Sequence, residues 1–214
     1  MLRHLLTRGL AVTAFDSDRE RLASLAADWP GKLRAAASLA ELVGCDTVIT
    51  MLPNSRETNQ VLAEGENPLI HVLRPDALVI DMGSSDPVET TRLAGLLNAA
   101  GIQLVDAPVS GSVAKAESGQ LSIMVGADSD LLERARPLLE VMGSIILPTG
   151  RVGSAHAMKA LNNYVYAAGL LAFRGSRLSG PTRWPCCPQR LTTPPFTATW
   201  KPCKQAWSPC ESPD

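Results

Sequence analysis

The chain has 214 residues, a formal net charge of −1, 45% hydrophobic residues and 19% charged residues. This length fits one domain, or one domain and part of a second, and the composition is that of a globular protein. The near-neutral charge gives no reason to expect nucleic acid or an anionic membrane as a partner. No apolar run approaches the roughly 18 residues of a membrane-spanning helix.

Short apolar strands alternate with helical segments from residue 1 to about residue 150. This alternation predicts an α/β fold with a parallel sheet and crossover helices. Asp86 is placed to cap one helix, with Pro87 at its tolerated first position. The expected helices are 2–8, 18–27, 87–99 and 128–142, and the expected strands are 12–15, 47–51, 78–81, 104–106, 121–125 and 144–147. The fold therefore begins with a helix, where a parallel sheet normally begins with a strand.

The composition changes beyond residue 172. Residues 173–214 contain eight of the sixteen prolines, four of the five cysteines and three of the four tryptophans, with no helical or alternating period. Proline at this density breaks helices and strands, so we expect a disordered tail. A shifted reading frame explains this composition better than a zinc site, because paired C-x₂-C ligands are missing. Cys45 is the single cysteine before the tail, which favours a cytoplasmic protein.

The segment DAPVSGSVAKAESGQLSIMVG, residues 106–126, starts at the end of an expected strand. Open α/β sheets bind ligands at the carboxyl ends of their strands. Ser110, Gly111 and Ser112 offer hydroxyls and closely spaced backbone N–H groups, which suit a small carboxylate. The alternative is a strand-to-loop turn that merely requires glycine, and the residues alone leave both interpretations open.

The segment GSAHAMKALNNYVYA, residues 153–167, lies in an expected helix over residues 152–172. Lys159, Asn162 and Asn163 share one face of this helix, because they are three and four positions apart. The opposite face has an apolar stripe of Met158, Leu161, Val165 and Ala168. Two amides beside a lysine favour a site that binds substrate and tunes the amine. The alternative is a solvated polar face, which is the commonest environment of lysine.

The segment DMGSSDP, residues 81–87, follows an expected strand and precedes the capped helix. Ser84 and Ser85 lie at the strand end, where they are placed to meet a cofactor ribose. They also fit an ordinary turn before a helix, and the segment alone favours that simpler interpretation.

Together and in this order, the three segments resemble the β-hydroxyacid dehydrogenases, the group of 3-hydroxyisobutyrate, tartronate semialdehyde and 6-phosphogluconate dehydrogenases. DAPVSG with SGQLSIMVG is similar to the substrate-binding signature of that family, and GSAHAMKALNN to its catalytic helix, G-x-x-x-x-x-K-x-x-N-N. MLPNS, residues 51–55, resembles the loop beside the adenosine part of the cofactor. DMGSSDP resembles the D-x-S-T-x-x-P segment, with Ser84 in the place of threonine. The resemblance covers residues 1 to about 172.

The resemblance implies a Rossmann-like domain over residues 1–150, followed by an all-helical domain whose first helix is 151–172. It implies hydride exchange between NAD, or alternatively NADP, and the carbinol carbon of a small 3-hydroxy acid. Lys159 would then be the general acid/base, with a pKa lowered by burial so that it can accept a proton. The implied substrate-binding residues are Ser110, Gly111, Ser112, Asn162 and Asn163.

The implied cofactor-binding residues are Asp16, Leu52, Pro53 and Ser84. Asp16 ends the second strand of such a domain, where an acid can bond the ribose hydroxyls and repel a 2′-phosphate. This favours NAD over NADP, although Arg19 and Arg21 lie close enough in sequence to weaken the argument. No metal is expected.

The sequence differs from the family in three places. The strand and G-x-G-x-M-G turn of full-length members are not found before the first helix, and their helical domain continues beyond residue 172. Ser112 replaces the commoner second glycine of the substrate loop. We therefore expect a Rossmann-like sheet without its first strand and a truncated helical domain. The alternative to an active oxidoreductase is an inactive fragment, a pseudoenzyme or an interaction module, and a homo-oligomer is expected only of a full-length form.

Overall fold

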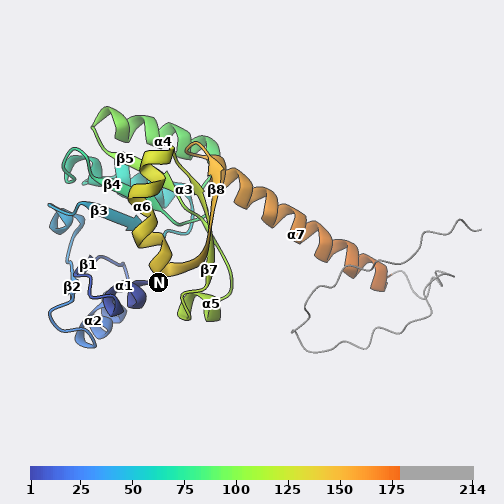
Figure 1. Ribbon diagram of the computed structural model, residues 1–214, viewed down its shortest axis with the longest axis horizontal. Helices are drawn as coiled ribbons and strands as arrows, with labels where there is room; N and C mark the ends of the chain where they lie inside the picture. Colours follow the sequence, from blue (N-terminus) through green and yellow to red (C-terminus); the bar gives the residue numbers. More distant parts are fainter. Residues whose placement is uncertain (179–214) are drawn as a thin grey trace, which may run out of the picture. The chain divides into compact units, whose positions relative to one another are not determined.

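Strands joined by helices form the framework of residues 1–178, which are the residues described by the computed structural model (Figure 1). The chain divides into two units at residue 172, and the fold below is that of the first, Met1–Ala172. The helices are α1 (Leu2–Thr7), α2 (Arg19–Ala27), α3 (Ser55–Asn59), α4 (Pro87–Ala99), α5 (Val113–Glu117), α6 (Ser129–Met142) and α7 (Ser154–Leu178), with short helical turns η1 (Leu39–Leu42), η2 (Gln60–Glu64) and η3 (Leu69–His71). The strands are β1 (Val12–Ala14), β2 (Leu33–Ala35), β3 (Thr47–Thr50), β4 (Leu78–Asp81), β5 (Gln103–Asp106), β6 (Val109–Ser110), β7 (Leu121–Gly126) and β8 (Gly143–Gly150).

The strands form two sheets, and the break lies between β1 and β3. β1 pairs with β2 in parallel, while β3, β4, β5, β7 and β6 follow one another in a second sheet, with β8 on β7. Among the described residues, β1 and β3 each have one edge without a strand partner. This interruption fits the expectation of a Rossmann-like sheet without its first strand.

The larger sheet is mixed. β3, β4 and β5 are parallel to one another, whereas β7 runs antiparallel to both β5 and β6. The structure confirms the predicted α/β fold and the six predicted strands, whereas β2, β6 and the reversal of β7 were not predicted. The direction of β7 depends on the short connection through β6 and α5, a segment without a clear period. The alternation rule therefore gave no information on its direction.

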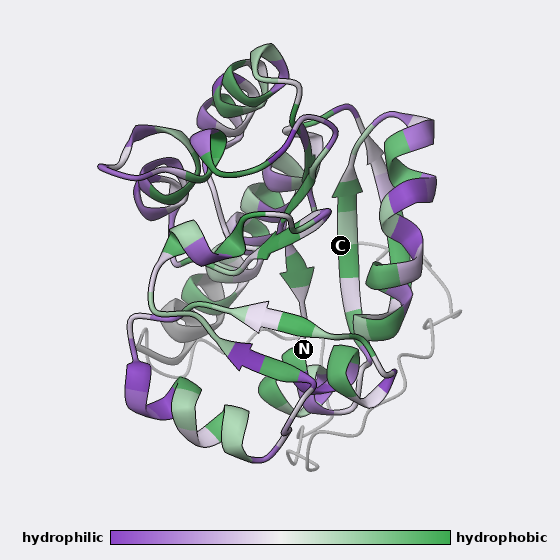
Figure 2. Ribbon diagram, turned by 90° about the vertical axis from the view of Figure 1, so that its left-hand side faces the viewer, coloured by the Kyte–Doolittle hydropathy of each residue, from purple (hydrophilic) through white to green (hydrophobic). Residues whose placement is uncertain are grey.

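Apolar side chains of the larger sheet point alternately to two core clusters. Ile80 of β4 and Val105 of β5 pack in the cluster that includes residues of α1 and α6. Val79 and Leu104, each one position earlier, pack in the cluster that includes residues of α4. A two-residue period places successive side chains on opposite faces of a strand. Helices therefore cover both faces of the sheet, and apolar and polar segments alternate along these helices in Figure 2.

Helix α7 is buried at its start and exposed along its length. Ala155 and His156 are at most 1% exposed, whereas the apolar stripe predicted from the sequence contacts solvent, with Met158, Leu161 and Val165 43%, 59% and 62% exposed. The helix extends to Leu178, past the predicted end at residue 172. None of the helices in residues 1–178 combines the length and the hydropathy that crossing a membrane requires. The four cysteines of the predicted tail lie outside the described residues.

The predicted capping of α4 is confirmed, and it allows a matched test of stability. The Asp86 carboxylate accepts hydrogen bonds from the amides of Val88 at 2.7 Å and Glu89 at 3.2 Å. Asp128 is in the same position before α6 but makes no side-chain cap hydrogen bond. We expect Asp86→Ala to lower the free energy of unfolding by about 1 kcal/mol, and Asp128→Ala by less than about 0.5 kcal/mol. Urea unfolding of both variants is the measurement, and equal losses would contradict the assignment.

Candidate functional site

Three buried titratable side chains meet where α7 begins. Asp81 is the last residue of β4, Asp106 is the last residue of β5, and His156 lies in the first turn of α7. Each is at most 1% exposed. β4 and β5 are neighbouring parallel strands, with Asp81 directly opposite Asp106. The cluster therefore lies at the carboxyl edge of the parallel strands, which is the edge where open α/β sheets bind ligands.

The Asp106 carboxylate binds the amino end of α7. Its Oδ1 accepts a hydrogen bond from the Gly153 amide at 2.8 Å, and its Oδ2 accepts one from the His156 amide at 2.9 Å. The first amides of a helix have no partner within the helix, and the helix dipole favours a negative charge beside them. A side chain of the sheet thus caps α7 and fixes where the helix starts.

The Asp81 carboxylate accepts hydrogen bonds from three donors on β3 and on the turn after β4. Its Oδ1 accepts hydrogen bonds from the Thr50 hydroxyl at 3.0 Å and the Gly83 amide at 3.1 Å. Its Oδ2 accepts one from the Ser85 hydroxyl at 2.9 Å. These bonds join the end of β3 to the turn after β4. A buried carboxylate needs such donors, because its charge has left water.

His156 lies between the two carboxylates. Its Nδ1 is 2.8 Å from the Thr90 hydroxyl of α4 and 3.8 Å from Asp106 Oδ2. Its Nε2 is 3.8 Å from Asp81 Oδ2 and, although buried, has no hydrogen-bond partner. The ring is buried, and its contacts join β4, β5, α4 and α7.

Two glycines leave room for this junction. A Cβ on Gly126 would lie 2.2 Å from Asp106 Oδ1, so any larger residue would displace the carboxylate. A Cβ on Gly153 would lie 2.6 Å from the Thr91 hydroxyl, and the φ of +92° at this position is strained for other residues. Gly153 is the first glycine of the predicted catalytic-helix motif. Its structural role is to let the turn before α7 approach α4.

The two segments predicted to bind and convert substrate lie apart in this structure. Ser110 pairs with Ser122 near the beginning of β7, whereas Asp106, beside the start of α7, pairs with Gly126 at its end. Four positions along a strand correspond to about 13 Å. Gly111 and Ser112 continue toward α5, which lies far from the start of α7 in Figure 1.

The predicted residues in these two segments are mostly accessible to solvent. Gly111, Ser112, Asn162 and Asn163 are exposed, and Ser110 and Lys159 are half-buried. Ser112 caps α5, its hydroxyl accepting a hydrogen bond from the Lys115 amide at 3.4 Å. The roles of these residues in substrate binding and catalysis remain predictions.

The residues predicted to bind cofactor all follow strand ends. Leu52 and Pro53 come after β3 and Ser84 after β4, two neighbouring parallel strands, and the Leu52 carbonyl lies against Gly83. Asp16 is exposed after β1, and its Oδ1 accepts a hydrogen bond from the Asp18 amide at 2.9 Å. The four residues thus follow the ends of β1, β3 and β4, and their role in cofactor binding stays a prediction.

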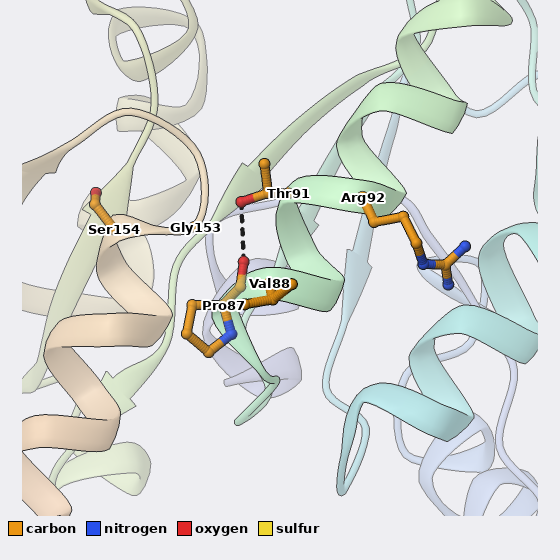
Figure 3. A pocket seen from close by; sticks show the side chains of 6 residues that line it. All are labelled: Pro87, Val88, Thr91, Arg92, Gly153 and Ser154. Carbon is orange, nitrogen blue, oxygen red and sulfur yellow. Dashed lines mark hydrogen bonds between the residues drawn. The ribbon is translucent and has the colours of Figure 1, made fainter.

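A shallow depression lies between the first turn of α4 and the turn before α7 (Figure 3). Arg92 is its charged side chain, but the guanidinium is paired with Glu89 and Glu64 at 2.9 and 2.5 Å. The hydroxyl of Thr91 is bound to the carbonyl of Pro87 at 2.9 Å. None of the predicted site residues lines this depression. It lies where α4 packs against the start of α7, beside the buried cluster.

Sequence reasoning treated Asp81 and Asp106 as strand ends and did not select His156. A usable signal was present, because each of two apolar strands, LVID and QLVD, ends in a carboxylate. Buried carboxylates at adjacent strand ends require donors, and an expected helix with an early histidine is one source. The pairing itself depends on strand order, which the sequence pattern does not give.

Comparison with known proteins identifies the family. Residues 1–153 match the family described as the NAD binding domain of 6-phosphogluconate dehydrogenase. The chain therefore belongs to this family of NAD-binding domains. The resemblance to β-hydroxyacid dehydrogenases and the Rossmann-like fold class are thereby confirmed, and the enzyme class of the family is that of NAD(P)-dependent oxidoreductases.

Characterised relatives extend well beyond the matched region. The chain is 33% identical to an NAD-dependent L-serine dehydrogenase of Pseudomonas aeruginosa over 167 residues, which is 78% of this chain and 55% of the relative. It is 37% identical to mouse mitochondrial 3-hydroxyisobutyrate dehydrogenase over 139 residues, 64% of this chain and 41% of the relative. The structure of Mycobacterium tuberculosis 3-hydroxyisobutyrate dehydrogenase with L-serine superimposes with a TM-score of 0.70 at 32% identity, covering 81% of this chain and 57% of that one. The chain thus spans about half the length of these relatives.

The charge of Asp106 gives a pH-dependent test of the junction. Burial raises the pKa of Asp106, although the hydrogen bonds from His156 and Gly153 and the nearby imidazole oppose the shift. The folded state then retains the proton to a higher pH than the unfolded state. The stabilisation from protonated Asp106 is fully present below the pKa of about 3.9 that its carboxyl has in the unfolded chain. It is lost as pH rises through the higher pKa of the folded state.

We expect Asp106→Asn to be less stable than the wild type at neutral pH by about 1–3 kcal/mol, because an amide can accept only one of the two N–H bonds. The deficit should be larger near pH 4 and shrink toward neutral pH, since asparagine does not titrate. Urea unfolding across this range is the measurement, with Asp128→Asn as the exposed control. If the stability difference between the wild type and Asp106→Asn instead grows toward neutral pH, the hydrogen bonds lower the pKa of Asp106 by more than burial raises it.

Proposed function

We propose that the chain contributes to an NAD-dependent dehydrogenase of the 3-hydroxyisobutyrate dehydrogenase type, acting on a small 3-hydroxy acid. Hydride passes between the carbinol carbon of the substrate and the nicotinamide, while Lys159 exchanges the proton of the substrate oxygen. We expect the protein to act in the cytoplasm, with homo-oligomers only in a full-length form.

The observation that carries this proposal is the anchored start of α7. Asp106 binds the amides of Gly153 and His156, which ties the helix to the carboxyl edge of β4 and β5. Lys159 follows within one turn of His156 and is half-buried. Its position near the edge where α/β folds bind ligands supports a role in catalysis over that of a solvated lysine.

Asn162, Asn163 and the segment Ser110–Ser112 are proposed to bind the substrate. The two amides lie one turn beyond Lys159, where they can orient its amine and a carboxylate. The backbone N–H groups around Gly111 supply a second anion-binding surface. Because the two segments lie apart here, substrate binding requires them to approach each other, or requires contacts from residues beyond those described.

The surroundings of Asp16 favour NAD over NADP. An exposed acid at this strand end can accept hydrogen bonds from ribose hydroxyls and repels a 2′-phosphate. One of the two competing cations, Arg19, is engaged elsewhere: its guanidinium donates to the Ala37 carbonyl at 2.8 Å and lies 5.7 Å from the centre of the Phe15 ring. Arg19 is thus a weaker candidate for binding a phosphate than the sequence alone suggested.

One observation favours an alternative function as an interaction module. The exposed stretch of α7 carries six large apolar side chains that are each at least 50% exposed, namely Leu161, Tyr164, Val165, Tyr166, Leu170 and Leu171. Exposed apolar surfaces of this kind are typical of contact regions. An assay of NADH oxidation with a 3-oxo acid distinguishes the two functions. An oxidoreductase consumes NADH in this assay, and an inactive interaction module does not.

The cofactor proposal predicts how binding depends on the glycine-rich turn. A polypeptide of these 214 residues contains no G-x-G-x-x-G turn, whose N–H groups bind pyrophosphate. We expect it to bind NAD weakly in calorimetric titration. Addition of a strand and such a turn before Met1 should strengthen binding, because the strand can pair with the open edges of β1 and β3. A low-micromolar dissociation constant without the addition would contradict this dependence.

The catalytic proposal predicts the effect of changing Lys159. In the form of the protein that turns over, Lys159→Ala should lower kcat by about 10²- to 10⁴-fold, the usual contribution of a general acid/base. The dissociation constant for NAD should change little, because the lysine acts on the substrate oxygen. Lys159→Arg should be nearly as inactive, since a guanidinium does not release its proton near neutral pH.

Lys32→Ala is the matched control, because Lys32 is an exposed lysine beside the Trp29 ring and away from the predicted segments. Its kcat should equal that of the wild type. A Lys159→Ala enzyme with a near-normal kcat would mean that another group transfers the proton. The polar face of α7 would then be an ordinary solvent-exposed face.

A further inference from the structure

We propose that His156 is a positioning residue: a proton on its Nε2, directed at Asp81, locks the first turn of α7 against the sheet. Nε2 is buried and has no hydrogen-bond partner, although it lies 3.8 Å from Asp81 Oδ2. Buried polar atoms without partners are rare in folded proteins, and each requires an explanation. Here the explanation is an electrostatic contact slightly longer than a hydrogen bond.

The placement of the proton follows from the donors around the ring. The Thr90 hydroxyl has a single proton, and it lies 2.9 Å from the Asp86 carbonyl and 2.8 Å from His156 Nδ1. If the hydroxyl donates to Nδ1, the neutral ring must carry its proton on Nε2. If the hydroxyl donates to the carbonyl, Nδ1 is the donor, and a bare Nε2 would face a carboxylate as a second acceptor.

The second arrangement is unfavourable, because it leaves a bare Nε2 beside the Asp81 carboxylate. A lone pair opposite a buried carboxylate is repelled, whereas an N–H is attracted more strongly than in water, because the ring and the carboxylate are buried away from water. Asp81 and Asp106 together place two carboxylates within 3.8 Å of the ring. The first arrangement is therefore favoured, in which the Thr90 hydroxyl donates to Nδ1 and Nε2 carries the proton.

The protonated ring completes a brace between four elements. Thr90 belongs to α4, Asp81 to β4 and Asp106 to β5, while the ring belongs to α7. Asp106 fixes the backbone of the first turn through the amides of Gly153 and His156, and the Ser154 hydroxyl lies 2.8 Å from that of Thr149. These contacts all lie at the start of the helix, about which it can pivot. The ring supplies a contact away from that pivot, at Asp81. The direction of α7, and with it the position of Lys159, then depends on His156.

The consequence for the position of Lys159 in catalysis rests on the proposed function, whereas the brace between the four elements does not.

Two substitutions separate the contacts of the ring. In His156→Gln the amide nitrogen takes the place of Nε2 and can still donate toward Asp81. In His156→Asn it takes the place of Nδ1 and reaches only Thr90. His71→Gln, at an exposed histidine, is the control.

The test is nuclear magnetic resonance on the isotope-labelled 214-residue chain, which has only three histidines. Correlation of the ring nitrogens with the ring carbon-bound protons identifies which nitrogen is protonated, and residual dipolar couplings report the direction of residues 155–159 relative to the sheet. We expect a protonated Nε2, couplings retained in His156→Gln and His71→Gln, and altered couplings in His156→Asn.

A bare Nε2, or couplings retained in His156→Asn, would overturn the proposal. If His156→Asn does not fold, the protonation of Nε2 in the wild type and the couplings of His156→Gln decide the question. With an active enzyme, His156→Asn should lower kcat by about 10²-fold, as expected for a misplaced catalytic group, and His156→Gln should restore it. Absence of activity in a wild-type form that carries the added strand and glycine-rich turn would contradict the proposed function and leave the nuclear magnetic resonance result to decide on the brace.

Discussion

The Asp106 carboxylate connects the sheet to the helix that carries the predicted catalytic lysine. Its two oxygens accept the amides of Gly153 and His156, so that a strand end caps a helix fifty residues later in the sequence. Burying this charge is costly, and the bonds to the helix amides offset the cost only if the geometry is maintained. Gly126 and Gly153 are needed for the same reason, because a Cβ at either position would collide with this junction.

The junction explains how a sheet interrupted between β1 and β3 can still position α7. The strands that contact the helix, β4 and β5, lie in the larger sheet and have strand partners on both sides. Their buried side chains pack in clusters on both faces of the sheet. The predicted cofactor residues, by contrast, follow β1, β3 and β4, two of which border the interruption. Binding of NAD is therefore more sensitive to the interruption than the placement of Lys159.

Much of the fold could be predicted from the sequence, because its elements have strong local signals. The capped helix after Asp86 and the apolar strands 47–51 and 78–81 are examples, and two ordered motifs indicated the family. The β2 strand at Leu33–Ala35 was missed, since three residues give no alternation. The antiparallel direction of β7 and the cluster around His156 depend on strand order. A buried histidine cannot be recognised from its sequence neighbours, since its partners are distant in the chain.

Amide hydrogen exchange tests the central claim most directly, because the claim concerns two particular backbone amides. We expect the amides of Gly153 and His156 to exchange as slowly as those of β4 and β5, whereas amides in the exposed part of α7, from Leu161 onward, should exchange faster. Exchange of the Gly153 and His156 amides at the rate of an exposed turn would contradict this expectation. The Asp106 carboxylate would then not anchor α7, and the proposed position of Lys159 would lose its support.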